Sequence, residues 1–192
     1  MKRSAPFYVL VLIVLMIFGW GVSNYEAPTP PSPMPEIQNY PTAGATQQPT
    51  YYVSVEGNDA NPGTAALPYK TIQKAINSVP SGSTILVKSG VYNERPIVLA
   101  SKNNLTIQAE TPLGAIVSRG FIISKNTGTV IDGFEMSATS TNYIDGFGIW
   151  VQGTNCVIKN NFIHDTAWGG IIMLYYTRSC TVTNNKLDGE IS

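Results

Sequence analysis

The residues that could carry out chemistry are few and widely spaced. His164 is the only histidine, and Asp165 and Trp168 lie close to it in the sequence. A histidine beside a carboxylate can act as an acid–base pair, but no nucleophile accompanies this one. We therefore interpret His164 as part of a hydrogen-bonded turn between strands, and an acid–base role is the alternative.

The acidic residues of the predicted coils do not form a cluster. Only two pairs, Asp132 with Glu135 and Asp188 with Glu190, lie within three residues of each other, and no two acidic residues are adjacent. A calcium site needs several oxygen ligands together, and proton abstraction needs a basic group beside the substrate. The sequence therefore assigns no catalytic, cofactor-binding or metal-binding role to Glu94, Glu110, Asp132, Glu135, Asp145, Asp165, Asp188 or Glu190.

Six aromatic residues could form a surface on which sugar rings stack. Aromatic side chains bury large areas, so the same residues could equally belong to a core. We expect about half of the set to be core, a division that the sequence does not make. The set consists of Tyr143, Phe147, Trp150, Trp168, Tyr175 and Tyr176.

A repeated segment predicts how these residues are positioned. Segments 83–86, 104–107, 128–131, 155–158 and 179–182 align without gaps, and their last residues are 21, 24, 27 and 24 residues apart. Side chains within each segment alternate between two faces, as in a β-strand. We expect two inward columns, Leu86, Ile107, Ile131, Ile158, Val182 and Thr84, Leu105, Thr129, Cys156, Cys180, and an outward column, Val87, Gln108, Asp132, Lys159, Thr183.

Each repeat continues with two further apolar stretches. The first stretch contains Val91, Pro112, Met136, Ile163 and Leu187. The second stretch covers residues 97–99, 121–123, 148–151 and 170–174. Three short strands per repeat predict an all-β fold, a right-handed single-stranded parallel β-helix of about five coils that is incomplete. Residues 71–79 carry apolar side chains at helical spacing and predict a short N-terminal capping helix.

Residues at equivalent positions of neighbouring repeats should meet. Asp132 and Lys159 share the outward column and predict a surface ion pair, with sugar binding by Lys159 as the alternative. Cys156 and Cys180 share an inward column at a separation that a disulfide tolerates, and both a disulfide and two free thiols stay open. A structural role in equivalent turns, through left-handed backbone and stacked amides, is predicted for Asn160, Asn161, Asn184 and Asn185.

Several stretches of the chain share the pattern of a known superfamily. They are residues 51–64 (YYVSVEGNDANPGT), 68–75 (PYKTIQKA) and 82–92 (GSTILVKSGVY), followed by 131–134 (IDGF) and 158–163 (IKNNFI). Together they resemble right-handed β-helix proteins of the pectin-lyase-like superfamily, in particular the N-terminal part of pectate lyase family 9 and related surface proteins. The resemblance runs from residue 51 to the end of the chain and implies the same fold.

For function, the resemblance implies a protein that binds or degrades polysaccharide, with a uronate-containing polymer as partner. Family 9 enzymes cleave such polymers by β-elimination with bound calcium, so Ca²⁺ is implied by the resemblance alone. Their paired aspartates have no counterpart here, and we expect them in later coils, beyond residue 192. A non-catalytic cell-surface β-helix protein, acting as an adhesin or carbohydrate-binding module, is the alternative.

The chain divides into four predicted parts. Residues 1–23 are expected to be a signal peptide or membrane anchor, because Lys2 and Arg3 precede the apolar run 7–18. Residues 24–50 contain seven prolines and are expected to be a linker. The first strand and the capping helix are expected in residues 51–82, and the coils in residues 83–192.

The charge balance limits the partners. Twelve basic and 12 acidic residues leave no net charge, which argues against a nucleic-acid-binding protein. With the N-terminal signal, these features predict a monomer that lies outside the cell or on its surface.

Overall fold

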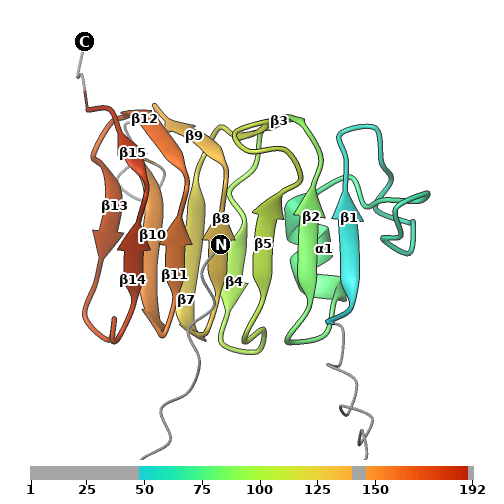
Figure 1. The fold of residues 1–192 in the computed structure, drawn as a ribbon, viewed down its shortest axis with the longest axis horizontal. Helices are drawn as coiled ribbons and strands as arrows, with labels where there is room; N and C mark the ends of the chain where they lie inside the picture. The colour runs from blue at the N-terminus through green and yellow to red at the C-terminus, as the bar shows by residue number, and fades with distance from the viewer. Residues whose placement is uncertain (1–47, 140–145, 190–192) are drawn as a thin grey trace, which may run out of the picture. The chain divides into compact units, whose positions relative to one another are not determined.

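The computed structural model describes residues 48–139 and 146–189. In these residues the chain passes through three parallel sheets in turn, which gives four complete coils and part of a fifth (Figure 1). The predicted all-β parallel β-helix is therefore confirmed. The predictions for residues 1–23 and for most of the linker lie outside the described residues. Within the described ranges, no helix is both long and apolar enough to span a membrane.

Each coil contributes one strand to each sheet, and all pairings between the strands are parallel. Sheet 1 contains β1 (Thr50–Val53), β2 (Thr84–Val87), β5 (Thr106–Ala109), β8 (Val130–Asp132), β11 (Val157–Lys159) and β14 (Thr181–Thr183). Sheet 2 contains β3 (Gly90–Tyr92), β6 (Ala115–Val117), β9 (Glu135–Ala138), β12 (Phe162–Thr166) and β15 (Lys186–Leu187). Sheet 3 contains β4 (Ile97–Leu99), β7 (Phe121–Thr127), β10 (Phe147–Thr154) and β13 (Gly169–Met173).

The predicted capping helix is α1 (Ile72–Ser78), which lies beside β1 and β2 at one end of the stack (Figure 1). The Thr71 hydroxyl caps it by accepting from the Lys74 N–H at 3.2 Å. The Glu94 carboxylate accepts from the N–H groups of Ile72 and Gln73 at 2.8 and 3.0 Å, where a helix favours negative charge. The helix closes the core with the buried side chains Ile72, Ala75, Ile76 and Val79.

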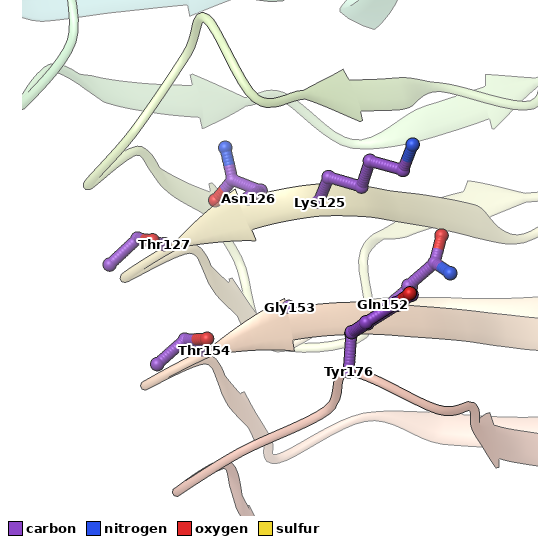
Figure 2. Close-up of a pocket in the computed structure, with 7 residues that line it drawn as sticks. All are labelled: Lys125, Asn126, Thr127, Gln152, Gly153, Thr154 and Tyr176. Atoms are coloured by element: carbon purple, nitrogen blue, oxygen red, sulfur yellow. The ribbon is translucent and has the colours of Figure 1, made fainter.

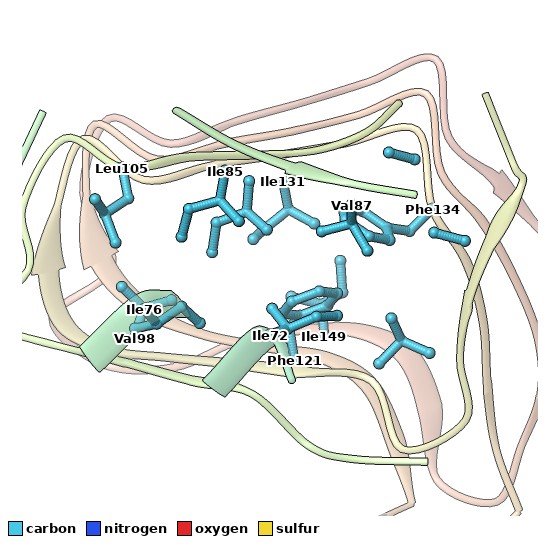
Figure 3. Close-up of a cluster of buried hydrophobic side chains, with 14 of the residues drawn as sticks. Ile72, Ile76, Ile85, Val87, Val98, Leu105, Phe121, Ile131, Phe134 and Ile149 are labelled. Carbon is cyan, nitrogen blue, oxygen red and sulfur yellow. The ribbon is translucent and has the colours of Figure 1, made fainter. Parts of the chain in front are cut away.

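The inward side chains of the three sheets form one continuous core (Figure 3). Its central column runs along sheet 1 through Ile85, Ile107, Ile131 and Ile158, which pair in register and are fully buried. Each such side chain contributes about 1.5–3 kcal/mol through burial alone. The core therefore holds the coils together, and the outer faces of the sheets are left to carry function.

The prediction for the first repeat is wrong by one residue. Ile85 pairs with Ile107, so Ile85 and Val87 point inward and Leu86 does not, although Leu86 was expected inward and Val87 outward. Thr84, also expected inward, pairs with Thr106 on the outward face. Three apolar residues follow one another here, so alternation alone does not identify the buried face.

The prediction for the first of the two further apolar stretches is also wrong in two repeats. Tyr92 and Val117 take the inward positions expected for Val91 and Pro112, and Val91 is 62% exposed. Residues 110–114 separate β5 from β6, whereas only residues 133 and 134 separate β8 from β9. Turns of unequal length shift the second strand, so spacing from the first strand does not locate it.

The predicted structural role of the turn asparagines is confirmed. Asn160 and Asn184 have left-handed backbone, with φ of 57° and 54°, which asparagine tolerates better than most residues. The amides of Asn161 and Asn185 bond along the coil axis, with Asn161 Nδ2 donating to Asn185 Oδ1 at 2.9 Å. Asn161 is almost fully buried, so these bonds hold the turns of neighbouring coils together.

Candidate functional site

The outer face of sheet 3 carries an open depression at the ends of β7 and β10 (Figure 2). Figure 2 shows Lys125 and Gln152 on these neighbouring strands with their side chains directed to the same side. The depression has a volume of about 330 Å³ and is lined by Lys125, Asn126, Thr127, Gln152, Gly153, Thr154 and Tyr176. We call it the Lys125 groove.

A β-bulge presents the Lys125 side chain. Gln152 of β10 pairs with Ser124, and Gly153 pairs with Asn126, so Lys125 is the extra residue of β7. Its backbone is left-handed, with φ of 52°, and its side chain is exposed. Bulges of this kind redirect a side chain and are over-represented beside functional sites. No carboxylate of the described residues pairs with the Lys125 ammonium, which leaves it available to an anionic ligand.

Buried polar contacts hold the floor of the groove. Asn126 is 1% exposed, and its Nδ2 donates to the carbonyl groups of Leu99 and Lys102 at 3.0 and 2.6 Å. The Thr129 hydroxyl donates to Asn126 Oδ1. Because every polar atom of the Asn126 amide is engaged, this residue positions the bulge and is not free to bind ligand.

Tyr176 forms one wall of the groove, in the loop between β13 and β14. Its ring is 64% exposed and lies 4.8 Å from the ring of Tyr175. The loop is tied to β10, because the Thr177 hydroxyl donates to the Val151 carbonyl and the Arg178 N–H donates to the Gly153 carbonyl, both at 2.9 Å. The aromatic wall therefore has a fixed base.

A Cβ atom at Gly153 would lie 2.8 Å from both the Asn126 carbonyl oxygen and Cys156 Sγ, so the floor of the groove has no room for a side chain there.

The structure divides the six aromatic residues that were candidates for sugar stacking. Phe147 is buried and meets the half-buried Trp150 edge-to-face, with ring centroids 5.9 Å apart. Trp168, Tyr175 and Tyr176 are exposed, but only Tyr176 lines the groove. Tyr143 lies outside the described residues. An exposed ring beside an ammonium and an amide suits a sugar ring that carries hydroxyl and carboxylate groups.

His164 lies in a strand, not in the turn that was predicted. It projects from β12 on the outer face of sheet 2, where Nδ1 lies 2.8 Å from Asp165 Oδ2 and Nε2 lies 3.2 Å from Glu135 Oε1 of the preceding coil. Partial burial opposes the charged imidazole, but the hydrogen bonds to Asp165 and Glu135 outweigh it and raise the pKa of His164. Asp165 is again a bulge residue with left-handed backbone, at φ of 47°.

The surroundings of His164 are charged and partly aromatic. The imidazole stacks on the Phe162 ring at a centroid distance of 4.6 Å. The Lys186 ammonium lies 4.5 Å from the centroid of the same Phe162 ring. Both ring nitrogens of His164 already have carboxylate partners. We therefore assign this cluster to holding neighbouring coils together, in agreement with the predicted hydrogen-bonded role.

The outward pair on sheet 1 is confirmed. Lys159 Nζ lies 3.2 Å from Asp132 Oδ2, and Asn160 Nδ2 donates to Asp132 Oδ1 at 2.8 Å. Both oxygens of this carboxylate are thus engaged by the next coil. Lys159 has its partner within the protein, which favours the ion pair over the alternative of sugar binding.

The two cysteines are free thiols that lie next to each other. Cys156 is fully buried and Cys180 is partly exposed. Burial, and then the neighbouring Cys180 side chain, raise the pKa of the Cys156 thiol to about 12.

Among the described residues, the acidic side chains do not gather into a calcium site. In residues 48–139 and 146–189, no group of three or more His, Cys, Asp or Glu side chains could hold a metal ion. The donor set of these residues therefore does not fit the calcium that the family resemblance implied.

Sequence reasoning missed Lys125 and Gln152. Lys125 is a bulge residue, and a bulge depends on how a strand pairs with its neighbour, which no local pattern reveals. Gln152 is one of many polar residues on an outward face. The only signal for this site was Tyr176, within the aromatic set.

Comparison with known proteins places the chain among β-helix proteins. The sequence matches the family described as "Protein of unknown function (DUF1565)" over residues 55–111 and 103–191. It is 40% identical over 75 residues to "Pectinesterase A" from Dickeya chrysanthemi, and equally so to that from Dickeya dadantii. This match covers 38% of the chain and 19% of each pectinesterase. The matched part of the chain therefore spans less than a fifth of the length of these curated relatives.

Among solved structures, the GH136 lacto-N-biosidase from Eubacterium ramulus is similar, with a TM-score of 0.55 and 15% sequence identity. The similarity covers 72% of this chain and 34% of that chain. At this identity the likeness concerns the fold alone, and it agrees with the pectin-lyase-like parallel β-helix predicted from the sequence.

Proposed function

The chain belongs to the family described as "Protein of unknown function (DUF1565)", and we propose its function from the geometry of its site. The proposal is that the Lys125 groove binds a polysaccharide that contains uronate residues. The observation that carries this proposal is the bulge that places the Lys125 ammonium, which has no carboxylate partner among the described residues, in the same groove as the exposed Tyr176. The pectinesterase likeness supports it, because that relative's name refers to pectin.

The chemistry of the groove matches the chemistry of a uronate. The Lys125 ammonium can pair with the sugar carboxylate, and the Gln152 amide can donate to and accept from ring hydroxyls. The Tyr176 ring offers an apolar face to the C–H groups of the sugar. The groove is open, so a polymer can pass through it without its ends having to enter.

We extend the proposal to where the protein acts. Residues 1–23 have the charge and apolar run of an export signal, so the chain would meet its polysaccharide outside the cytoplasm, as a monomer. Fractionation of cells that produce the chain tests this location. Recovery of the chain only in the cytoplasm would contradict it.

The binding test uses two ligands that differ only at the carboxyl group: polygalacturonate, which is anionic, and its fully methyl-esterified form, which is neutral. Lys125→Gln should weaken binding of polygalacturonate about fivefold and leave the ester unaffected, because only the acid offers a carboxylate to the ammonium. Tyr176→Ala should weaken binding of both about tenfold, since it removes the stacking surface. Titration calorimetry with oligomers of each ligand measures these differences.

Lys70→Gln is the matched control, because Lys70 is also exposed and lies outside the groove. It should bind like the unmodified chain. Equal losses for Lys70→Gln and Lys125→Gln would show that binding depends on total charge and would contradict the proposed site.

A further inference from the structure

Cys156 and Cys180 face each other across neighbouring coils, immediately before β11 and β14. The residues that follow them, Val157 and Thr181, pair in register, so the two cysteines are directly opposite. The Cys156 N–H donates to Cys180 Sγ at 3.3 Å. The sulfur of Cys180 therefore already reaches the backbone of the preceding coil.

The cysteines lie at a corner of the coil and not within the regular ladder. Asn155 and Ser179, which precede them, have left-handed backbone with φ of 53° and 51°. A corner frees the side chains from the parallel stacking that makes a disulfide between ladder residues difficult. Adjacent strands lie about 4.8 Å apart, which falls within the Cα separation that disulfides span.

We propose that Cys156 and Cys180 form a reversible disulfide that joins these two coils beside the Lys125 groove. The oxidant is a disulfide, either a low-molecular-weight one or that of a protein oxidoreductase. The Cys180 thiolate attacks one sulfur of the oxidant, the oxidant's S–S bond breaks, and its first thiolate leaves. The Cys156 thiolate then attacks Cys180 Sγ, forms the internal bond and expels the second thiolate.

Atoms and electrons balance in this exchange. The two protons that leave the cysteine thiols are taken up by the two thiolates released from the oxidant. Two electrons pass from the cysteine pair to the oxidant, which is reduced to two thiols.

Accessibility sets the order of the two attacks. Cys180 is partly exposed and can meet an external disulfide, whereas Cys156 is fully buried. Burial and the neighbouring sulfur keep the Cys156 thiol protonated, with its pKa raised to about 12, so the second attack is the slow one. The rate of closure should therefore increase with pH.

The bond would also act on the groove, a consequence that rests on the proposed function. Cys180 Sγ contacts the carbonyl oxygen of Gly153 at 3.4 Å, and Cys156 Sγ contacts that of Thr154 at 3.6 Å. Gly153 and Thr154 line the groove, and Cys180 ends the loop that carries Tyr176. A disulfide would fix this loop to the groove floor and strengthen polyuronate binding.

The test incubates the full chain with oxidised glutathione, blocks the remaining thiols with iodoacetamide and measures the intact mass. We expect a loss of about 2 Da for the two hydrogens, no alkylation, and a peptide linking Cys156 to Cys180. The melting temperature should rise by about 5–10 °C and return after reduction. Alkylation of both cysteines after this treatment, or a stable glutathione adduct on Cys180, would overturn the proposal.

Serine variants give the matched controls. Ser83 and Thr129 occupy the equivalent inward positions of earlier coils and are fully buried, so this column accepts a hydroxyl. Cys156→Ser and Cys180→Ser should fold, and neither should gain stability from oxidised glutathione. An equal gain in either variant would overturn the proposal.

Polyuronate binding is compared in the reduced and oxidised chains to test the coupling. Tighter binding after oxidation is the expected result. If the linked peptide forms while both states bind equally, the coupling is wrong and the disulfide stands. If neither state binds, the proposed function fails, independently of the disulfide.

Discussion

Asn161 shows how one side chain can determine the path of a turn. Its Oδ1 accepts from the Phe134 N–H at 2.9 Å, and its Nδ2 donates to the Ile131 carbonyl at 3.2 Å. Asn185 repeats the second contact one coil later, with the Ile158 carbonyl at 2.8 Å. The amide thus replaces the backbone partners that the sharp turn between sheets 1 and 2 removes.

Asn161→Ala should lower the free energy of unfolding by about 1–3 kcal/mol, because the buried Phe134 N–H would lose its partner. Urea unfolding followed by circular dichroism measures this loss. Asn184→Gly is the control, since Asn184 is exposed and glycine accepts its left-handed backbone. A loss for Asn161→Ala no larger than for the control would refute the role of the amide.

At this scale, the sequence predicted contacts between equivalent positions and missed contacts that depend on irregular pairing. The pair Asp132 and Lys159 followed from a shared column, and so did the asparagine turns. Lys125 and Asp165 did not, since each becomes a bulge only through the strand beside it. A bulge adds one residue without changing the alternation on either side enough to be recognised.

Strands β9 and β12 show how elements of neighbouring coils are held together outside the core. Glu135 of β9 reaches His164 of β12, and Asp165 engages the other ring nitrogen. The protonated imidazole donates to both carboxylates, so the positive charge contributes to the contact between the two coils. Because the folded-state pKa of His164 is raised, this contribution is present below the ordinary pKa of 6.5 and is lost as pH rises through the folded pKa.

The difference in melting temperature between the unmodified chain and His164→Gln should therefore be larger at about pH 5.5 than at about pH 8.5. His164 is the only histidine, so proton NMR of its imidazole gives its pKa directly. Glu135→Gln and Asp165→Asn should each lower that pKa by removing one carboxylate. A titration at or below 6.5 in the unmodified chain would contradict the assignment.

The elements themselves were predicted well where apolar and polar residues alternate. The strands of sheet 3 and helix α1 fall where the sequence placed them. The errors at Leu86, Val91 and Pro112 arose where three apolar residues adjoin or where a turn is longer than in the next coil. Tertiary stacking, and not local pattern, selects the register at such places.

The whole β-helix is a stack in which each coil touches only its neighbours. Stability is therefore distributed as a sum of coil and interface contributions, and a residue's position along the stack matters as much as its type. Ile131 and Val182 occupy the same inward column, yet Ile131 is fully buried between two coils and Val182 is 43% exposed on β14.

In the 192-residue chain, Ile131→Ala should lower the free energy of unfolding by about 2–5 kcal/mol, because it opens a cavity between packed coils. Val182→Ala should cost less than about 1 kcal/mol, since half of its side chain already contacts water. Urea unfolding of both variants, followed by circular dichroism, measures the two losses. Equal losses would mean that β14 is packed as tightly as β8, which would contradict the exposed position of Val182 and the nearest-neighbour account of the stack.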